Sequence, residues 1–336
     1  MNKLSSQLFN QHFSHIYVEK DILDNKKVLE ILSHYKNSNI IEINHYKDVF
    51  SRGNQNFVLQ KQSPKLILAQ KKDNLIYKGA DVCENFGNKN FYYTSIIMNC
   101  IYDCEYCYLQ GMYTSANIVV FVNIEDYFAE VEKILKHDDV YLCISYDTDI
   151  LALEGLLGYT KLWIDFAKLH DNLMIEIRTK SSNFNSIENI TPSDNVILAW
   201  TLSPDEVIEE YENKTPKLKE RMNNIKSAVN KGWKVRLCFD PILYVPDWEI
   251  KYRILIEEVF NNIDSDCILD VSLGVFRVSK DYLKKMRKQR HYSLVLNYPY
   301  ETEGGVSSYS KDLSDKMLQY VYKLVKQYIP ENKIYV

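Results

Sequence analysis

From about residue 91 onward, short apolar runs alternate along the chain with longer stretches of helical periodicity. Runs of apolar, β-branched and aromatic residues predict six strands. Apolar residues that recur every three to four positions predict helices in the gaps between them. The predicted strands are residues 91–98, 140–146, 173–179, 196–202, 234–239 and 268–275. The predicted helices are residues 124–137, 153–170, 205–231, 248–262 and 280–290.

This alternation predicts an α/β fold whose parallel strands are joined by right-handed crossovers. Six units are too few for a closed eight-stranded barrel, so we expect a partial (β/α)6 TIM-like barrel with its site at the carboxyl ends of the strands. Before the barrel, the pattern predicts a helix near residues 24–35 and strands at 39–43 and 65–68. After it, an amphipathic helix is predicted near residues 310–328, ahead of Pro330.

The chain shows no internal repeat and no linker rich in Pro or Gly, which favours one domain with added segments at both ends. We therefore divide it into an N-terminal elaboration packed on the core (residues 1–90), the partial barrel (91–300), and a C-terminal segment with its helix (301–336).

Composition narrows the class of protein. With 46% hydrophobic residues, the 336-residue chain can bury a large core, and no apolar run is long enough to cross a bilayer. The first residues lack the apolar centre of a signal peptide, so we expect a cytoplasmic location. A net charge of −4 does not indicate a general nucleic-acid binder, although local basic patches remain possible.

Three of the seven cysteines, Cys100, Cys104 and Cys107, form a C-x3-C-x2-C run directly after the first predicted strand of the barrel. Three thiolates can hold three corners of a [4Fe–4S] cluster, whereas full ligation takes four. The fourth iron would then be open to a small molecule. The alternative is a zinc site completed by a distant His, but zinc sites usually pair two C-x2-C units and no second unit is present.

The order of strand, three-cysteine loop and parallel α/β array resembles the radical S-adenosylmethionine superfamily. The resemblance implies that the open iron binds the methionine part of S-adenosylmethionine and that an electron from the cluster releases a 5′-deoxyadenosyl radical. It also implies that Tyr106, just before the third cysteine, packs at the adenine. Many members carry Gly-Gly-Glu after the second strand, whereas this chain has residues 146–149, Tyr-Asp-Thr-Asp. The remaining cysteines are too scattered to suggest an auxiliary cluster.

Residues 104–110, Cys-Glu-Tyr-Cys-Tyr-Leu-Gln, resemble the C-x-Y-C-Y-L-Q signature of spore photoproduct lyases. Shorter matches follow in the same order, so the resemblance covers nearly the whole chain. They are Val122-Asn123, Thr148-Asp149-Ile150, Thr179-Lys180, Glu220-Arg221-Met222, Lys231-Gly232, Pro241-Ile242 and Trp248.

Membership of this family implies a DNA repair lyase active in sporulation, with a [4Fe–4S] cluster and S-adenosylmethionine as cofactors. The substrate would be the spore photoproduct, 5-thyminyl-5,6-dihydrothymine, which is split back into two thymines. In the family the adenosyl radical takes a C6 hydrogen, the bridge between the bases breaks, and a protein thiol reduces the thymine allyl radical. A tyrosine pair then helps to regenerate the cofactor. The matching tyrosines are Tyr106 and Tyr108, for which packing beside the cluster is an equally compatible role.

The donor thiol is where this chain departs from the family. A Cys-x-x-Asp is common after the second strand, and counting back from Asp149 puts Tyr146 at the donor position. Cys143 lies nearby, but side chains alternate along a strand, so residues 143 and 146 should face opposite ways. Cys83, in a polar segment before the first barrel strand, could fold over the site. We favour Cys83 as donor, while Cys143 and a tyrosine relay through Tyr146 stay open.

Other positions follow from the resemblance or from the chemistry of the side chain. Thr148 and Lys180 match positions expected near S-adenosylmethionine. Arg277, past the sixth strand, could contact phosphate or form a salt bridge. Arg221 is interpreted as a surface charge on a helix, and Cys143, Cys238 and Cys267 are interpreted as small buried hydrophobic residues.

The family's Gly-Arg-Tyr-Gly segment near the C-terminus, where an arginine is expected to contact DNA, appears here as residues 300–305, Tyr-Glu-Thr-Glu-Gly-Gly. Its two carboxylates would repel phosphate. The expected partners are damaged DNA, whose lesion must be extruded from the duplex, and a low-potential flavodoxin or ferredoxin. Two alternatives stay open: a radical enzyme of the same fold acting on a tRNA, peptide or small metabolite, and a non-catalytic redox sensor or nucleic-acid-binding module.

Overall fold

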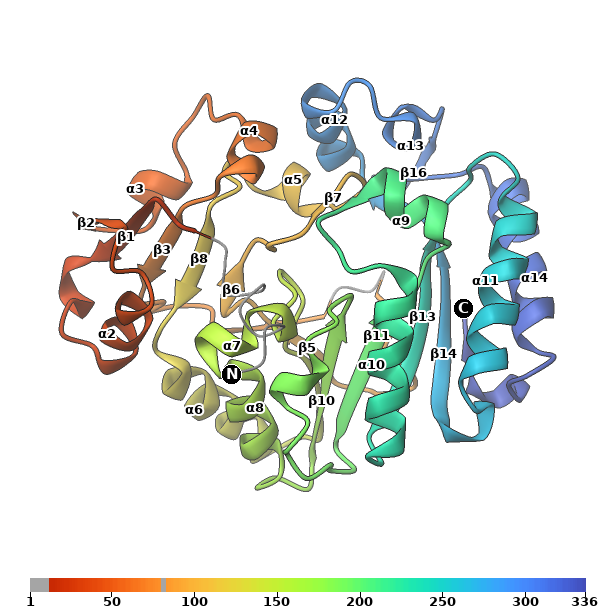
Figure 1. Ribbon diagram of the computed structural model, residues 1–336, viewed down its shortest axis with the longest axis horizontal. Coiled ribbons are helices and arrows are strands. Elements are labelled where there is room, and N and C mark those ends of the chain that lie inside the picture. The colour runs from red at the N-terminus through yellow and green to blue at the C-terminus, as the bar shows by residue number, and fades with distance from the viewer. Residues whose placement is uncertain (1–11, 80–82) are drawn as a thin grey trace.

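The computed structural model describes residues 12–79 and 83–336. Parallel strands form two sheets that meet where the chain passes from one to the other at residues 95–96, and helices cover their outer side (Figure 1). This arrangement confirms the predicted α/β partial barrel. The division of the chain at residues 90 and 300 stays a prediction.

The larger sheet supplies the barrel strands. Within the described residues it has the order β18-β14-β13-β11-β10-β9-β5-β4, and all neighbours are parallel except β4 and β5. The carboxyl ends of its parallel strands therefore meet at one edge. The strands are β4 (Ile76–Lys78), β5 (Phe91–Thr94), β9 (Val140–Cys143), β10 (Leu173–Thr179), β11 (Val196–Thr201), β13 (Lys234–Ile242), β14 (Ile268–Val275) and β18 (Ile334–Tyr335).

The smaller sheet has the order β2-β1-β3-β8-β6 in the described part of the chain. Its neighbours are parallel except β6 and β8, which are antiparallel. It combines N-terminal strands with β8, a strand from beyond the three-cysteine motif that the sequence analysis did not predict. The strands are β1 (His15–Glu19), β2 (Asn39–Ile43), β3 (Leu66–Ala69), β6 (Ile97–Met98) and β8 (Ile118–Phe121).

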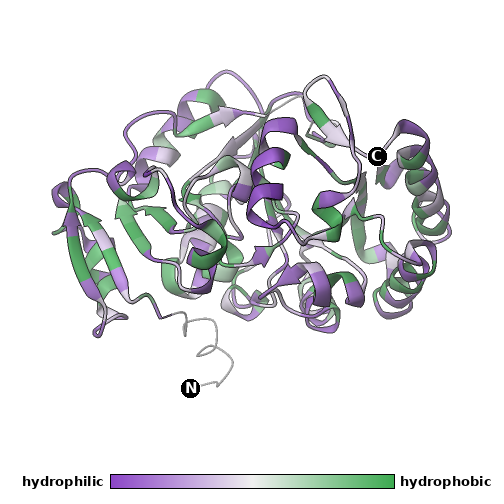
Figure 2. Ribbon diagram, turned by 90° about the horizontal axis from the view of Figure 1, so that it is seen from above, coloured by the Kyte–Doolittle hydropathy of each residue, from purple (hydrophilic) through white to green (hydrophobic). Residues whose placement is uncertain are grey.

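Amphipathic helices cover the outer side of the larger sheet. Their apolar faces pack on the strands, and both are buried as a result. Figure 2 shows hydrophilic residues along the outer faces of these helices and hydrophobic residues on the strands. None of the helices in the described residues is both long and apolar enough to cross a membrane. The main outer helices are α6 (Ile124–Leu135), α8 (Tyr159–Ala167), α10 (Leu218–Asn230), α11 (Trp248–Asn262) and α14 (Lys311–Val325).

Further strands and helices complete the described part of the fold. A two-stranded ribbon joins β7 (Asp103–Cys104) to β12 (Glu212–Asn213), and a three-stranded sheet has the order β15-β17-β16. The strands of that small sheet are β15 (Arg277–Ser279), β16 (Glu301–Glu303) and β17 (Val306–Ser308). The helices are α2 (Lys26–Ser33), α3 (Lys47–Phe50), α4 (Phe57–Gln62), α5 (Leu109–Met112), α7 (Glu154–Leu157), α9 (Asp205–Tyr211), α12 (Lys280–Gln289) and α13 (Leu294–Asn297).

Three predicted elements are divided in the structure. The strand predicted at residues 91–98 is two strands, because β5 pairs with β9 while β6 pairs with β8 of the other sheet. The helix predicted at residues 153–170 is interrupted at Gly158, whose φ of 65° is left-handed. The helix predicted at residues 205–231 is interrupted by β12 and by Pro216, which has no backbone N–H to continue a helix.

Candidate active site

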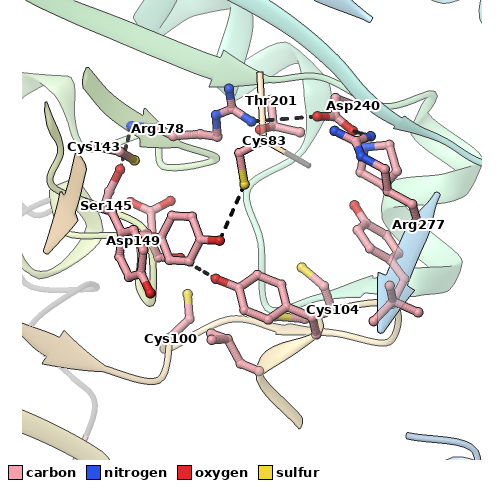
Figure 3. A pocket seen from close by; sticks show the side chains of 18 of the residues that line it. Cys83, Cys100, Cys104, Cys143, Ser145, Asp149, Arg178, Thr201, Asp240 and Arg277 are labelled. Carbon is pink, nitrogen blue, oxygen red and sulfur yellow. Dashed lines mark hydrogen bonds and ion pairs between the residues drawn. The ribbon is translucent and has the colours of Figure 1, made fainter. Parts of the chain in front are cut away.

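A cavity of about 580 Å³ opens at the carboxyl ends of the barrel strands (Figure 3). Two chain segments line it in addition to the strand ends. We call residues 99–108 the cysteine loop and residues 83–88 the Cys83 segment. The lining includes every residue that the sequence singled out for catalysis, cofactor binding or metal binding: Cys83, Cys100, Cys104, Tyr106, Cys107, Tyr108, Thr148 and Lys180.

The cysteine loop is held by side chains from distant parts of the chain. The buried Lys61 Nζ, on α4, donates to the backbone carbonyls of Cys100 at 2.5 Å and Tyr102 at 2.6 Å. On the other side of the loop, Cys104 pairs with Glu212 in the β7–β12 ribbon, and Arg290 forms an ion pair with Asp103. The backbone that carries the three thiols is thus fixed from several directions.

The three thiols lie in surroundings that oppose their ionisation. Burial, with the Asp149 carboxylate, raises the pKa of Cys100 to about 12. Burial also raises the pKa values of Cys104 and Cys107, against the opposing charge of Lys180. All three are free thiols, and no group of His, Cys, Asp or Glu in the described residues is gathered to hold a single metal ion. Thiolates here require a strongly cationic group, and a cluster whose irons each take one thiolate fits that requirement.

Tyr106 belongs to a buried ionic network. Its hydroxyl donates to Glu212, which also pairs with Arg221 Nη2 at 2.5 Å and Lys180 Nζ at 3.9 Å. Burial raises the pKa of Glu212, but Arg221 and Lys180 outweigh that effect and lower it to about 2. The predicted surface position of Arg221 is wrong, since its side chain is fully buried. The reason is that the predicted long helix is broken, which lets α10 turn Arg221 toward Glu212.

Tyr108 and Tyr146 connect the cysteine loop to the Cys83 segment. The Tyr108 hydroxyl donates to the Tyr146 carbonyl at 2.8 Å and to Asp147 Oδ1 at 3.3 Å. The Tyr146 hydroxyl lies 3.5 Å from Cys83 Sγ, the contact drawn as a dashed line in Figure 3. Cys83 therefore lines the cavity, as the sequence predicted, and it lies beside Tyr146.

Two expectations about the other cysteines are wrong. Cys143 and Tyr146 were expected to face opposite ways, but both line the cavity. The strand β9 ends at Cys143, so the alternation of side chains does not extend to residue 146. Cys143 and Cys238 are buried as interpreted, whereas Cys267 is exposed because it lies in a short turn before β14.

Thr148 and Asp149 follow the second barrel strand. The Thr148 hydroxyl is buried and has no hydrogen-bond partner among the described residues, which marks a position where a ligand could supply one. Asp149 accepts from the Thr179 hydroxyl at 2.8 Å and from the backbone N–H of Lys180 at 2.7 Å. It thereby fixes the end of β10, from which Lys180 extends into the cavity.

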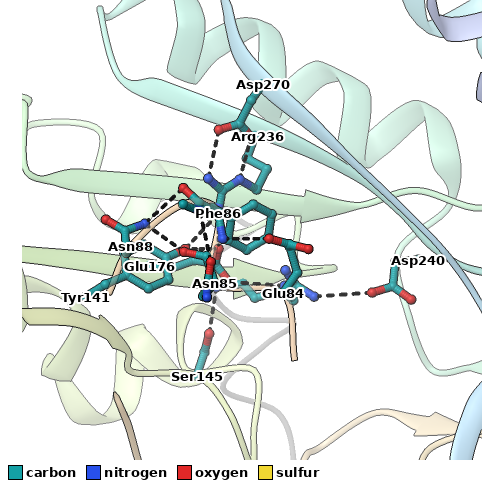
Figure 4. A network of polar contacts seen from close by, with 12 residues as sticks. Glu84, Asn85, Phe86, Asn88, Tyr141, Ser145, Glu176, Arg236, Asp240 and Asp270 are labelled. Atoms are coloured by element: carbon teal, nitrogen blue, oxygen red, sulfur yellow. Dashed lines mark hydrogen bonds and ion pairs between the residues drawn. The ribbon is translucent and has the colours of Figure 1, made fainter. Parts of the chain in front are cut away.

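A buried ionic network lies beneath the Cys83 segment (Figure 4). Arg236 Nη1 lies 2.5 Å from Glu176 Oε2, and Arg236 Nε lies 2.5 Å from Asp270 Oδ1. The Phe86 ring covers the guanidinium, whose carbon is 3.3 Å from the ring centroid, and Phe86 also packs on Tyr141. Phe86 is only 7% exposed, so it is the residue that anchors the Cys83 segment in the barrel.

The sequence analysis missed the acids and bases of the barrel interior. Glu176 and Arg178 are two residues apart in the largely apolar strand β10, and Arg236 lies between the apolar residues Val235 and Leu237 of β13. Such spacing places side chains on one face of a strand and was the available signal. Arg178 and Arg277 both approach Asp240, at 3.7 Å and 3.3 Å, so the salt bridge expected as one role of Arg277 is present.

Comparisons with known proteins agree with this geometry. A family model described as spore photoproduct lyase matches residues 13–335. The chain is 21% identical over 176 residues to spore photoproduct lyase of Clostridium acetobutylicum, covering 51% of this chain and 52% of that protein. It is 22% identical over 182 residues to that of Bacillus subtilis strain 168, covering 53% of each. These matches thus span about half the length of the curated relatives.

Among solved structures, the chain is similar to spore photoproduct lyase complexed with dinucleoside spore photoproduct. The TM-score is 0.81 at 18% identity, over 96% of this chain and 98% of that one. The same values hold for a variant of that enzyme with bound AdoMet and dinucleoside spore photoproduct. At this identity the likeness establishes the fold.

Proposed function

The chain belongs to the spore photoproduct lyase family, and we propose that it is a radical S-adenosylmethionine lyase that repairs the spore photoproduct in DNA to two thymines. One observation carries the proposal. The three cysteines of the cysteine loop line the same cavity as Cys83, which comes from another segment (Figure 3). Such an arrangement would let the loop hold a cofactor at one side of the substrate and Cys83 supply a hydrogen atom at another. The relative with bound dinucleoside spore photoproduct suggests the substrate.

We assign the cofactors to the cysteine loop and the ends of the first strands. Cys100, Cys104 and Cys107 would hold a [4Fe–4S] cluster, and Tyr106, Thr148 and Lys180 would contact S-adenosylmethionine. Three free thiols in one loop and the unpaired hydroxyl of Thr148, all lining the cavity, fit these ligands. When bound, the cluster supplies the electron that cleaves S-adenosylmethionine to methionine and a 5′-deoxyadenosyl radical.

Cys83 is the proposed hydrogen donor. Its thiol would give a hydrogen atom to the thymine allyl radical left after the bridge between the two bases breaks. The Tyr146 hydroxyl, 3.5 Å from the sulfur, would then return a hydrogen atom to Cys83. In this proposal Tyr146 occupies the position where the family commonly has its donor cysteine. Its role is to return the hydrogen atom to Cys83.

Tyr108 is the proposed continuation of this path toward the cofactor. Its ring centroid lies 6.1 Å from that of Tyr146, and its hydroxyl donates to the Tyr146 carbonyl. The nearby Asp147 carboxylate can accept the proton that a phenol loses on oxidation. Tyr106, bound to Glu212 and lying under Lys180 Nζ at 5.6 Å from its ring centroid, would shape the cofactor site. Tyr106 remains a candidate for the second redox tyrosine.

Substrate contacts are assigned to the arginines at the cavity mouth. Arg277 is partly exposed, and both it and Arg178 line the cavity, where they could exchange Asp240 for a phosphate of the lesion. A lesion in a duplex would have to be extruded to reach this depth, which costs a few kcal/mol and less for a damaged step. The physiological reductant is proposed to be a flavodoxin or ferredoxin. The cytoplasmic location stays a prediction.

A second candidate is a radical lyase of the same fold acting on another substrate, such as a tRNA, a peptide or a small metabolite. It is favoured by one feature: Glu301 and Glu303, on the hairpin of β16 and β17, are both exposed. Two carboxylates on this hairpin oppose a nucleic-acid backbone by charge repulsion.

The deciding experiment supplies the synthetic dinucleotide lesion to the reconstituted protein, anaerobically, with S-adenosylmethionine and dithionite. We expect conversion to the undamaged thymine dinucleotide, measured by chromatography. Formation of 5′-deoxyadenosine without repair would favour the second candidate. Absence of both, in a protein with full iron and sulfide content, would contradict a radical lyase of either kind and leave the redox sensor or binding module.

A further inference from the structure

Tyr146 is the first member of an aromatic stack that leads away from the cavity. Its ring lies on that of Tyr93 with centroids 4.0 Å apart and planes inclined by 24°. Tyr93 lies in turn on Tyr77, with centroids 5.0 Å apart and planes inclined by 13°. We call Tyr146, Tyr93 and Tyr77 the tyrosine stack. Beyond it, Lys71 Nζ donates to the Tyr77 hydroxyl at 2.9 Å.

The stack runs from the donor thiol to the edge of the larger sheet. Tyr77 and Tyr93 are directly opposed residues of β4 and β5, and β4 is the edge strand in the described residues. Tyr77 and Lys71 are half-buried, so solvent reaches this end. Face-to-face packing of a cross-strand pair would need only aromatic rings, which phenylalanine also provides. Three oxidisable phenols in contact, beginning at a thiol, call for a further explanation.

We propose that the tyrosine stack is a radical exit path, which carries oxidation from Cys83 to the protein surface when a thiyl radical is not returned to the cofactor. The inference rests on the proposed function for the source of that radical. It extends that function with a second branch, because Tyr146 contacts both Tyr108, on the way to the cofactor, and Tyr93, on the way out.

Each step balances as the transfer of one hydrogen atom. Tyr146 gives its phenolic hydrogen to the Cys83 thiyl radical, so an S–H bond forms and an O–H bond breaks. Tyr93 then passes an electron to Tyr146, which takes a proton from water, and Tyr93 releases its own phenolic proton to water. Tyr77 reduces Tyr93 in the same way and gives its own proton to Lys71. A small-molecule thiol finally restores Tyr77 by donating a hydrogen atom. The thiyl radical left on that small molecule pairs with a second one to form a disulfide.

Lys71 suits the role of proton acceptor. Burial lowers its pKa to about 8, although the Asp147 carboxylate acts in the other direction. Part of the amine is therefore neutral near that pH. In the neutral form Lys71 accepts the hydrogen bond from the Tyr77 hydroxyl instead of donating it, and it can take the proton that Tyr77 loses. An ordinary surface lysine would remain protonated.

The path is tested from its outer end, since the same contacts carry an electron in either direction. The full chain is oxidised by flash-generated tris(bipyridine)ruthenium(III) in the presence of a nitrone spin trap, and adducts are mapped by mass spectrometry. Neither the cluster nor the lesion takes part. The exposed thiol of Cys267 is an internal reference that the oxidant reaches directly. Tyr92→Phe is the matched control, since Tyr92 neighbours Tyr93 on β5 but points to the other face of the strand.

Wild-type protein and Tyr92→Phe should give an adduct on Cys83. Phenylalanine is much harder to oxidise than tyrosine. The yield of the Cys83 adduct should therefore fall at least about tenfold in Tyr93→Phe, because a potential difference of ~59 mV already changes a one-electron equilibrium by that factor. Tyr77→Phe should behave alike, and the Cys267 adduct should be equal in all four proteins. A Cys83 adduct that survives in both Tyr93→Phe and Tyr77→Phe, or that never forms in wild type while Cys267 reacts, overturns the inference.

The test separates this inference from the proposed function. If oxidation reaches Cys83 through Tyr93 but the protein fails to convert the dinucleotide lesion, the proposed repair activity is wrong and the radical path stands. If the protein repairs the lesion fully but its Cys83 adduct does not depend on Tyr93, the proposed activity stands and the radical path is wrong.

Discussion

The cysteine loop and the Cys83 segment face the same cavity but are held in different ways. Lys61, Arg290, the β7–β12 ribbon and the Glu212–Arg221 pair all fix the cysteine loop. The Cys83 segment is anchored chiefly by Phe86 on Arg236, and Cys83 itself touches Tyr146. Three thiols that share one cluster must keep fixed mutual positions, whereas a hydrogen donor has only to reach one reacting atom. A donor thiol can therefore come from a different segment, as we propose here.

The largest effect is expected from removing one thiol of the cysteine loop. Cys104→Ala should lose most of its iron and sulfide and reduce 5′-deoxyadenosine formation to background, because the two remaining thiols of the loop leave a second corner of the cluster without its ligand. Iron and sulfide analysis after anaerobic reconstitution checks this. Cys267→Ala, an exposed thiol outside the cavity, is the control and should keep both. Full iron content in Cys104→Ala would contradict the assignment of the cysteine loop.

The support of the cysteine loop can be weakened without touching a thiol. Arg221→Met leaves Glu212 buried and without its closest cation, which should reduce the free energy of unfolding by about 3–5 kcal/mol. The control is Arg253→Met, which breaks an exposed helix pair with Glu257 and should cost about 0.3–0.5 kcal/mol. Urea denaturation measures both. Equal losses in the two variants would show that the Glu212–Arg221 pair does not hold the loop.

The same pair predicts a pH dependence. The pKa of Glu212 is about 2 in the folded state against an ordinary value of 4.5, so its ion pairs stabilise the fold fully above 4.5. That stability is lost as the pH falls from about 4.5 to 2, on the order of 3 kcal/mol. Over this window the wild type should lose more free energy of unfolding than Glu212→Gln, which cannot titrate. Parallel curves for the two proteins would argue against a depressed pKa.

The smallest effect on stability is expected at Cys83. Cys83→Ala should change the free energy of unfolding by no more than about 0.5 kcal/mol, since the residue is partly exposed and forms no ion pair. It should still form 5′-deoxyadenosine but divert thymine radicals to side adducts, as seen by product chromatography. Cys143→Ala, which changes another thiol of the same cavity, should repair cleanly. Clean repair by Cys83→Ala would remove Cys83 from the mechanism.

The sequence by itself determined the local and periodic features of this protein. The spacing of Cys100, Cys104 and Cys107 predicted a cluster loop, and the alternation of strands and helices predicted the barrel, with β10, β14 and α11 at the expected bounds. Both depend on residues close together in the chain, where spacing alone fixes which side chains share a face.

Only the tertiary structure decided which distant residues meet. The burial of Arg221 against Glu212, the contact of Cys83 with Tyr146, and the stacking of Tyr77 on Tyr93 and Tyr146 join segments whose separation along the chain carries no information about distance. The split of residues 91–98 between two sheets has the same origin, because an apolar run does not reveal which strand it will pair with. Such contacts form only when the whole chain folds, because the connections between the strands decide which segments are brought together.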